Sequence, residues 1–170
     1  FDGTAAEVPE AEPNNGVPAA EPHKNVDFVS GKITRSTKDV DWFYSLARPG
    51  DLVFAYVDTS FPTPIGDSYL TVYEQNTESV FPSFLASDNN GGQGYSSAIA
   101  GVQTNSDKVY FAVREYANSL SDGEGALVGD ELEYRLYSAI VSPDKTARER
   151  EPNDLREYAQ EINSAIQLGN

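Results

Sequence analysis

The segment that decides the fold is Glu131-Leu132-Glu133-Tyr134-Arg135-Leu136, in which charged and apolar residues alternate. Successive side chains of a β-strand point to opposite faces of a sheet, so the leucines and the tyrosine would share one buried face. The charged residues would then face solvent. Residues 109–113 repeat this alternation with Val109, Phe111 and Val113. Both segments are therefore predicted to be half-buried strands.

Short apolar segments continue along the chain from Phe28 and are separated by Gly, Pro, Asn and Asp at intervals of roughly 8 to 12 residues. This spacing is typical of an all-β sandwich. The predicted strands cover residues 28–34, 41–47, 51–58, 68–75, 79–86, 96–101, 108–116 and 131–141.

The turn sequence Arg48-Pro49-Gly50-Asp51 combines a proline that fixes φ with a glycine that permits positive φ. It predicts a hairpin between strands 41–47 and 51–58. The second of these strands is apolar on both faces, through Val53, Phe54, Tyr56 and Val57. That composition predicts a central strand.

The two flanks of the predicted sandwich differ from it in composition. Residues 1–27 contain four prolines and show no strand period, so they are expected to be an extended lead-in. The sandwich itself is expected over 28–142, and 143–170 are expected to be a linker and the start of a second repeat. Within that last segment, apolar residues recur at helical spacing over 154–162, which predicts a short amphipathic helix.

The pattern Glu-x-Glu-Pro-Asn-[Asn/Asp] occurs twice, as Glu10-Ala11-Glu12-Pro13-Asn14-Asn15 and as Glu149-Arg150-Glu151-Pro152-Asn153-Asp154. The two copies predict a repeated module, of which the second begins near the end of this chain. Each copy gathers several hard oxygen ligands in a short, stiff segment, and such ligands suit calcium.

Asp39 and Asp41 are two residues apart and would share a face at the start of an apolar strand. Two like charges so close repel unless a cation, or a lysine such as Lys38, lies near them. The alternative is that Asp39 ends a turn and Asp41 caps the strand. The turn Asp88-Asn89-Asn90 leaves a similar choice between a second cation site and a solvated turn.

Composition excludes several classes of protein. The net charge of −15 and the absence of a basic stripe argue against a nucleic-acid partner. The acidity fits either solubility in a salty or extracellular medium or the collection of cations. With no cysteine, and with the single histidine, His23, expected on the surface of the lead-in, no nucleophilic catalytic arrangement is predicted. No apolar run is long enough to span a membrane.

The ordered set of motifs resembles the bacterial pre-peptidase C-terminal domain family, which is similar to the collagen-binding domains of secreted bacterial collagenases. The resemblance covers residues 10 to 141. Its matching pieces are 10–15, Gly31-Lys32-Ile33, Asp39-Val40-Asp41-Trp42-Phe43, the Pro49-Gly50 turn, 67–73, 87–90 and 109–113.

The resemblance implies a jelly-roll-like antiparallel β-sandwich whose lead-in folds back on the sheet and binds Ca²⁺. The ligands it implies are Glu10, Glu12, Asn14 and Asn15 from the lead-in and Asp39 and Asp41 from the sheet, with a backbone carbonyl near Ser30.

The function implied by the resemblance is that of a non-catalytic accessory module in a larger secreted or cell-surface protein. Such a module would aid substrate attachment, stability or export, and would contact an extracellular protein or polysaccharide surface. The alternative is a structural or adhesive module that self-assembles, in which residues 149–170 of one chain complete a neighbouring sandwich. The two differ in solution: an accessory module stays monomeric, whereas the assembling module forms oligomers that calcium promotes.

Overall fold

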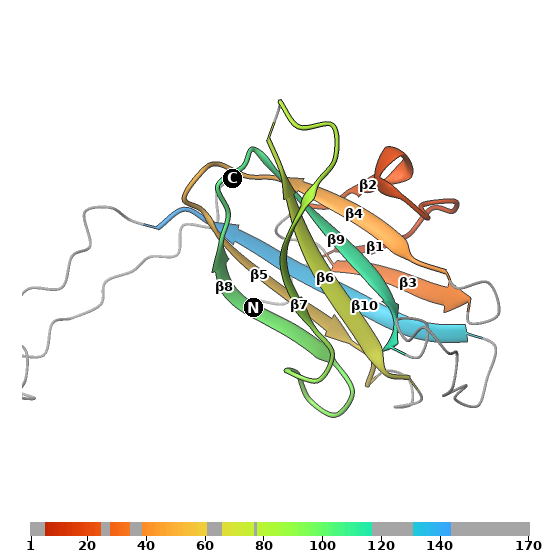
Figure 1. Cartoon of the computed structure of the whole chain (residues 1–170). Coiled ribbons are helices and arrows are strands. Elements are labelled where there is room, and N and C mark those ends of the chain that lie inside the picture. Colours follow the sequence, from red (N-terminus) through yellow and green to blue (C-terminus); the bar gives the residue numbers. More distant parts are fainter. Residues whose placement is uncertain are drawn as a thin grey trace, which may run out of the picture.

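The computed structural model is a sandwich of two five-stranded sheets (Figure 1). It describes residues 6–24, 28–34, 39–60, 66–76, 78–116 and 131–143. The first sheet has, in spatial order, β1 (Glu7–Pro9), β3 (Phe28–Thr34), β10 (Glu131–Val141), β5 (Leu52–Asp58) and β8 (Ser97–Gln103). The second sheet has β2 (Glu21–Pro22), β4 (Asp41–Leu46), β9 (Lys108–Glu115), β6 (Ser68–Gln75) and β7 (Ser83–Asp88). The predicted all-β sandwich is thus confirmed.

The alternation of apolar and charged residues along the strands determines which side chains form the core. Along β10, Leu132, Tyr134 and Leu136 are buried, while the charged residues between them face outward. On the facing sheet, β9 buries Val109, Phe111 and Val113. The inward faces of the two sheets therefore meet in one apolar core, as in other β-sandwiches.

The hairpin predicted from the turn at residues 48–51 is wrong. The turn is present, and Gly50 has a φ of 99°, but β4 lies in the second sheet and β5 in the first. A turn sequence fixes a reversal of the chain and leaves open whether the flanking strands pair or enter opposite sheets. The predicted central position of β5 is confirmed, because it lies between β10 and β8.

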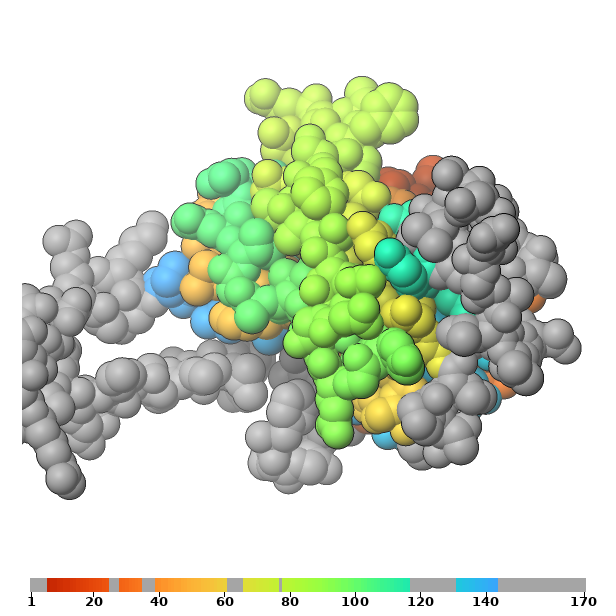
Figure 2. Space-filling view, turned by 60° about the horizontal axis from the view of Figure 1, so that its bottom comes forward, coloured from red at the N-terminus to blue at the C-terminus, as the bar shows by residue number. Residues whose placement is uncertain are grey.

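One predicted strand begins later than expected, because two apolar residues before it lie in a connection. The predicted strand 79–86 is observed as β7 at Ser83–Asp88. Val80 and Phe81 are 80% and 78% exposed and belong to the β6–β7 connection, which projects from the body of the molecule (Figure 2).

The lead-in contributes short elements to both sheets. β1 pairs in parallel with β3 at the edge of the first sheet, and β2 pairs in parallel with β4 at the edge of the second. All other strand pairs are antiparallel. A 3₁₀ turn, η1 (Val17–Ala19), lies between β1 and β2. Residues 10–15 therefore cross the open edge between the sheets.

Two expectations concern residues outside the described ranges: the helix at 154–162 and the second copy of the repeated pattern at 149–154. In the ranges that the structure does describe, no helix has the length and apolarity needed to cross a membrane.

Candidate metal centre

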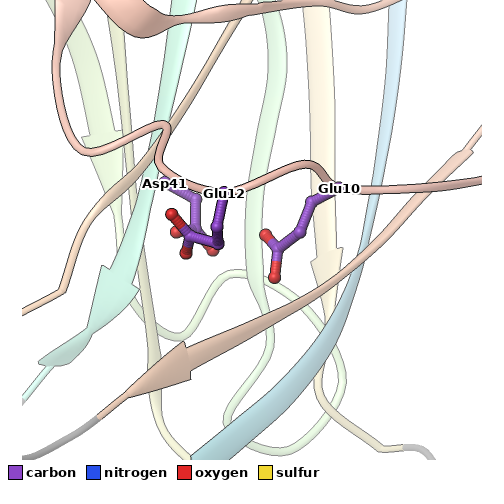
Figure 3. Close-up of side chains that lie close together, drawn as sticks. All are labelled: Glu10, Glu12 and Asp41. Atoms are coloured by element: carbon purple, nitrogen blue, oxygen red, sulfur yellow. The ribbon is translucent and has the colours of Figure 1, made fainter.

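Three carboxylates meet where the lead-in crosses the edge of the sandwich. Glu10, Glu12 and Asp41 each offer one oxygen, and these oxygens all lie within 4.8 Å of one another. Figure 3 shows the side chains of Glu10 and Glu12 descending from the lead-in toward Asp41 at the start of β4. Asp41 is fully buried, whereas Glu12 is exposed. The cluster thus extends from the interior of the sandwich to its surface.

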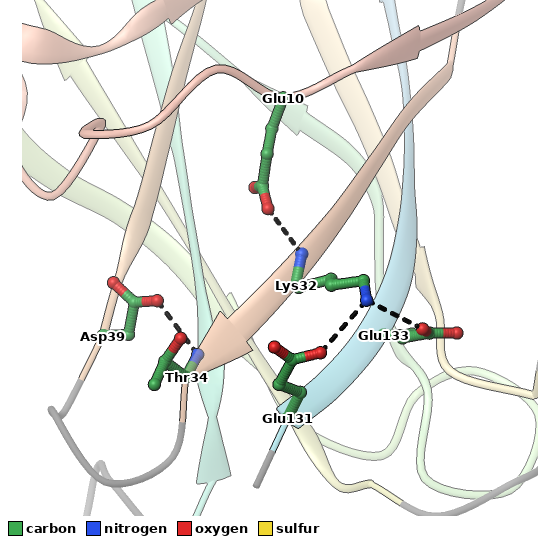
Figure 4. A network of polar contacts seen from close by, with 6 residues as sticks. All are labelled: Glu10, Lys32, Thr34, Asp39, Glu131 and Glu133. Atoms are coloured by element: carbon green, nitrogen blue, oxygen red, sulfur yellow. Dashed lines mark hydrogen bonds and ion pairs between the residues drawn. The ribbon is translucent and has the colours of Figure 1, made fainter.

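The edge of β3 positions Glu10. Its backbone N–H donates to the carbonyl of Ser30 at 3.0 Å, which continues the parallel pairing of β1 with β3. Its Oε1 accepts a hydrogen bond from the backbone N–H of Lys32 at 2.6 Å (Figure 4). Glu10 is therefore held on both sides of Gly31, by its backbone at Ser30 and by its carboxylate at Lys32.

Gly31 leaves the space that this arrangement needs. A Cβ at this position would overlap the phenol end of Tyr134 and the carboxylate of Glu10. Tyr134 is the register partner of Gly31 across the β3–β10 pair. The tyrosine ring consequently lies over the glycine and reaches the edge of the sheet.

The start of β4 positions Asn14 and Asn15, which end the Glu-x-Glu-Pro-Asn-Asn pattern of the lead-in. The backbone N–H of Asn14 donates to Glu12 Oε2 at 3.0 Å, and the carbonyl of Asn14 accepts from the N–H of Trp42 at 3.1 Å. Asn15 Oδ1 accepts from the N–H of Val40 at 3.5 Å. These contacts bring Glu12 next to Asp41, even though the two residues lie far apart in the sequence.

The Tyr134 hydroxyl connects two of the acids. It lies 2.6 Å from Asp41 Oδ2 and 3.0 Å from Glu10 Oε2. A phenol has one proton and can donate it to one carboxylate at a time. The cluster therefore needs a further proton or a cation to compensate its charge.

Burial and mutual repulsion shift the pKa values of these groups. Desolvation, followed by hydrogen bonding to Glu10, raises the pKa of Asp41 from 3.8 to about 9, and the charges of Glu10 and Asp39 contribute to the increase. Desolvation also raises the pKa of Glu10 above 4.5 and that of Tyr134 above 10.0. A buried carboxylate next to other acids favours its protonated form unless a positive charge is present.

Lys38, which the sequence suggested as a source of that charge, lies outside the described residues. Lys32, the lysine whose backbone contacts Glu10, does not supply it. Lys32 Nζ lies on the outer face, where it pairs with Glu131 at 3.0 Å and with Glu133 at 3.2 Å (Figure 4). Only the backbone of Lys32 bonds to Glu10, through the N–H already described.

The donor set fits a hard divalent cation. Asp41 Oδ1 and Asn14 Oδ1 are both buried, and neither has a hydrogen-bond partner in the structure. Buried polar atoms usually find a partner, so two such oxygens suit an ion or an ordered water. The other groups are carboxylate oxygens, the ligand type that calcium prefers. An open pocket lined in part by Glu10, Gly31 and Tyr134 adjoins the cluster at Glu10.

The remaining predicted ligands make hydrogen bonds around the cluster. Asp39 lies outside the three-carboxylate group, and its Oδ2 accepts from the N–H of Thr34 at 2.9 Å. Asn15 Oδ1 receives the N–H of Val40, and the carbonyl of Ser30 receives that of Glu10. The sequence did not identify Tyr134 as part of the site. Its only signal was membership of an alternating strand, which predicted a core residue.

The structure also shows the contacts of His23 and of the turn at Asp88. His23, expected on the surface, is 5% exposed, and its ring meets Phe111 edge to face at 6.2 Å between centroids. The pairing of β2 with β4 turns this side chain inward, a result that the prolines around it did not indicate.

In the turn that begins at Asp88, the Oδ2 of this residue accepts hydrogen bonds from the N–H groups of Gly91 at 2.6 Å and Ala98 at 2.9 Å. That carboxylate acts as a turn cap.

No protein-family model and no curated protein sequence matches the chain. The solved structures that are similar to it include the following three. The pre-peptidase C-terminal domain of a collagenase from Bacillus anthracis is 15% identical with a TM-score of 0.46, over 70% of this chain and 93% of that one. PliG of Aeromonas hydrophila, a periplasmic inhibitor of g-type lysozyme, is 12% identical with a TM-score of 0.45, over 80% and 96%. CorA of Methylomicrobium album BG8, a surface-associated copper-binding protein, is 13% identical with a TM-score of 0.44, over 71% and 97%. The first of these is a domain of the family that the motifs resemble.

Proposed function

We propose that Glu10, Glu12 and Asp41 bind a calcium ion that fixes the lead-in across the edge of the sandwich. The main observation behind this proposal concerns Asp41. Its side chain is fully buried beside two other carboxylates, and its Oδ1 has no hydrogen-bond partner. An uncompensated charge in that position is costly, and a divalent cation removes the cost. Asn14 Oδ1, together with water, is proposed to complete the six to eight oxygen ligands that calcium typically takes.

The ion would supply attachment that the lead-in lacks. Residues 7–9 are exposed, and β1 is only three residues long, so this segment buries little apolar surface. Its described contacts are mainly backbone hydrogen bonds to β3 and β4. A metal that joins Glu10 and Glu12 to Asp41 couples its binding free energy to the ordering of the segment.

The role that we propose for the chain is that of a non-catalytic, calcium-stabilised accessory module of a larger secreted or cell-surface protein. It would aid substrate attachment, stability or export of that protein. Extracellular calcium modules work with dissociation constants of roughly 10⁻⁴ to 10⁻³ M, and three carboxylates with one amide are a donor set suited to that range. The net charge of −15 suits a medium rich in salt.

Calorimetric titration of the full chain with calcium tests the proposal, followed by melting in calcium and in chelator. The variant E149Q/E151Q removes the second copy of the pattern, so any site that remains belongs to residues 10–41. We expect one site, and a calcium-dependent gain of about 1.4 to 2.7 kcal/mol in unfolding free energy at 10 to 100 times the dissociation constant. Absence of binding heat, with equal melting temperatures in the two buffers, would contradict the proposal.

A further inference from the structure

We propose that the outer face of the second sheet binds an acidic polysaccharide, a polymer of sugar units that carry carboxylates. The face is formed by β4, β9, β6 and β7, which lie side by side in this sheet (Figure 1). The inference goes beyond the proposed function, because it assigns a partner to a surface outside the metal centre. It does not require bound calcium.

Aromatic side chains form a row across the four strands of this face. Successive members of the row are register partners, and residues directly opposite each other share a face of the sheet. In order, they are Tyr44, Tyr110, Tyr73 and Phe84. Trp42 lies beside the row, and its ring stacks on that of Tyr73 at 5.2 Å between centroids. Phe84 is 63% exposed, and Trp42, Tyr44 and Tyr73 are partly exposed, so the row presents ring surface to solvent.

Two cations lie on the same face, one toward each end of β9. Lys108 Nζ lies 4.7 Å from the ring centroid of Tyr44, and the guanidinium of Arg114 lies 4.8 Å from that of Tyr69. In the ranges that the structure describes, neither cation pairs with a carboxylate, whereas Lys32 on the first sheet pairs with two. The rings hold these two charges on the face and do not neutralise them.

The acidic residues of these four strands point away from the face. Asp41 and Glu115 are buried in the interior. Glu74 and Asp88 accept hydrogen bonds from residues at or next to the two ends of β8, in the first sheet. A chain with a net charge of −15 therefore has one strand face that bears two cations and no carboxylate. Such a face is complementary to an anionic partner.

The spacing of the cations favours a polymer over a small anion. Lys108 and Arg114 are six residues apart on one strand, a distance of about 20 Å. A polymer with repeating charges can meet both cations at once and gains affinity from the second contact, whereas a small anion meets only one. Sugar units also have C–H faces and hydroxyl groups, which match the apolar rings and polar tips of the tyrosines between the cations.

The fluorescence of Trp42, the single tryptophan of the chain, can report binding at this face. Titration with polygalacturonate should change it saturably, and chelator is present so that calcium cannot bridge protein and polymer. Raising the ionic strength from about 0.05 M to about 0.5 M should raise the dissociation constant about tenfold.

Two reference polymers separate charge from sugar recognition. Highly methyl-esterified pectin has the same backbone with most of its charge removed, and polyglutamate has carboxylates but no sugar units. Each should bind about tenfold more weakly than polygalacturonate, or weaker still.

Paired variants locate the site. K108Q/R114Q removes both cations and should raise the dissociation constant for polygalacturonate about tenfold. W42A, followed by calorimetry, should raise it by a similar factor or more. The matched control is K32Q/R135Q, which removes the same charge from the outer face of the first sheet, where Arg135 lies over the ring of Phe28. It should leave binding unchanged.

Three results would overturn the inference: no saturable binding of polygalacturonate, equal binding of polyglutamate, or equal weakening by K32Q/R135Q and K108Q/R114Q. Asp41→Asn should bind the polymer as the wild type does, because Asp41 lies between the sheets. Loss of the metal centre and loss of polymer binding can therefore be told apart. A chain that binds calcium but ignores polygalacturonate would support the proposed function and reject this inference.

Discussion

The hydroxyl of Tyr134 lies 2.6 Å from Asp41 Oδ2, although the two residues are 93 positions apart in the sequence. The contact joins β10 of the first sheet to β4 of the second at the edge that the lead-in crosses. Among the described residues, Tyr134 is the only side-chain donor to Asp41. Glu10 accepts from the same hydroxyl, so the two acids compete for one proton. The hydroxyl and a cation are therefore alternative ways of compensating one buried charge.

This relationship predicts the effect of Tyr134→Phe. In chelator, loss of the donor to a buried carboxyl should reduce the unfolding free energy by about 1 to 3 kcal/mol. In calcium the loss should be smaller, because the ion compensates the charge. Chemical denaturation in both buffers measures the difference.

The matched control is Tyr110→Phe, whose hydroxyl donates to the neutral Gln75 Oε1 at 2.7 Å on the outer face of the second sheet. It should lose the same amount in calcium and in chelator. A Tyr134→Phe loss that is larger in calcium would show that the hydroxyl supports the metal-bound state instead.

Neutral variants of the acids separate ligands from structural carboxylates. Asp41→Asn and Glu12→Gln keep the shape of the side chain but remove the charge that attracts an ion. In chelator, they should change the melting temperature little, because the repulsion that they relieve offsets the contacts that they weaken. In calcium, they should abolish most of the stabilisation and raise the calcium dissociation constant about tenfold or more, an effect that calorimetry measures.

Asp39→Asn is the comparison for these variants. Its Oδ2 accepts a hydrogen bond from the N–H of Thr34, outside the three-carboxylate group. We expect it to lose about 1 kcal/mol of unfolding free energy equally in both buffers. A calcium-specific loss would instead make Asp39 a ligand, as the sequence predicted.

Gly31→Ala tests the packing beneath the site. The added methyl group would overlap the Tyr134 phenol and the Glu10 carboxylate, so the strand or the ring must move, at a cost of about 1 to 3 kcal/mol. Calcium binding should weaken as well, because Glu10 is displaced. Gly16→Ala is the control: its φ of −175° is open to any residue, and the nearest atom to its new methyl group lies at 3.8 Å. Thermal melts that show equal losses for the two variants would contradict this account.

Much of the fold could be predicted because alternation and burial coincide. The predicted bounds 28–34, 68–75 and 131–141 are those of β3, β6 and β10. Two predictions were wrong for different reasons. Val80 and Phe81 are apolar but belong to an exposed connection, and the turn at 48–51 links the two sheets instead of two paired strands. Neither local pattern contains information about which strands pair.

The acidic members of the site could be predicted from their spacing, but their grouping could not. The proximity of Glu12 and Asp41 depends on hydrogen bonds from Asn14 and Trp42 across the edge of the sandwich. The role of Tyr134 depends on its register with Gly31. A one-residue shift of β10 would turn that tyrosine to the outer face, so the position of its hydroxyl is a property of the sheet and not of the local sequence.

The raised pKa of Asp41 predicts an unusual pH dependence of stability. Its pKa is 3.8 in the unfolded reference and about 9 in the metal-free fold, so the folded state binds the proton more tightly. Stability therefore falls as the pH rises through this window, and the raised pKa of Glu10 acts in the same direction. Below 3.8 both states are protonated, and this contribution no longer changes.

In chelator, we accordingly expect the melting temperature to decrease between about pH 5 and pH 8, and this slope should be much smaller in Asp41→Asn. Calcium must displace the proton, so its affinity should increase with pH and cancel the slope. Titration in two buffers with different ionisation enthalpies should detect proton release near pH 7. A melting temperature that rises with pH in chelator would mean that Asp41 is already ionised in the metal-free protein, and that another group compensates its charge.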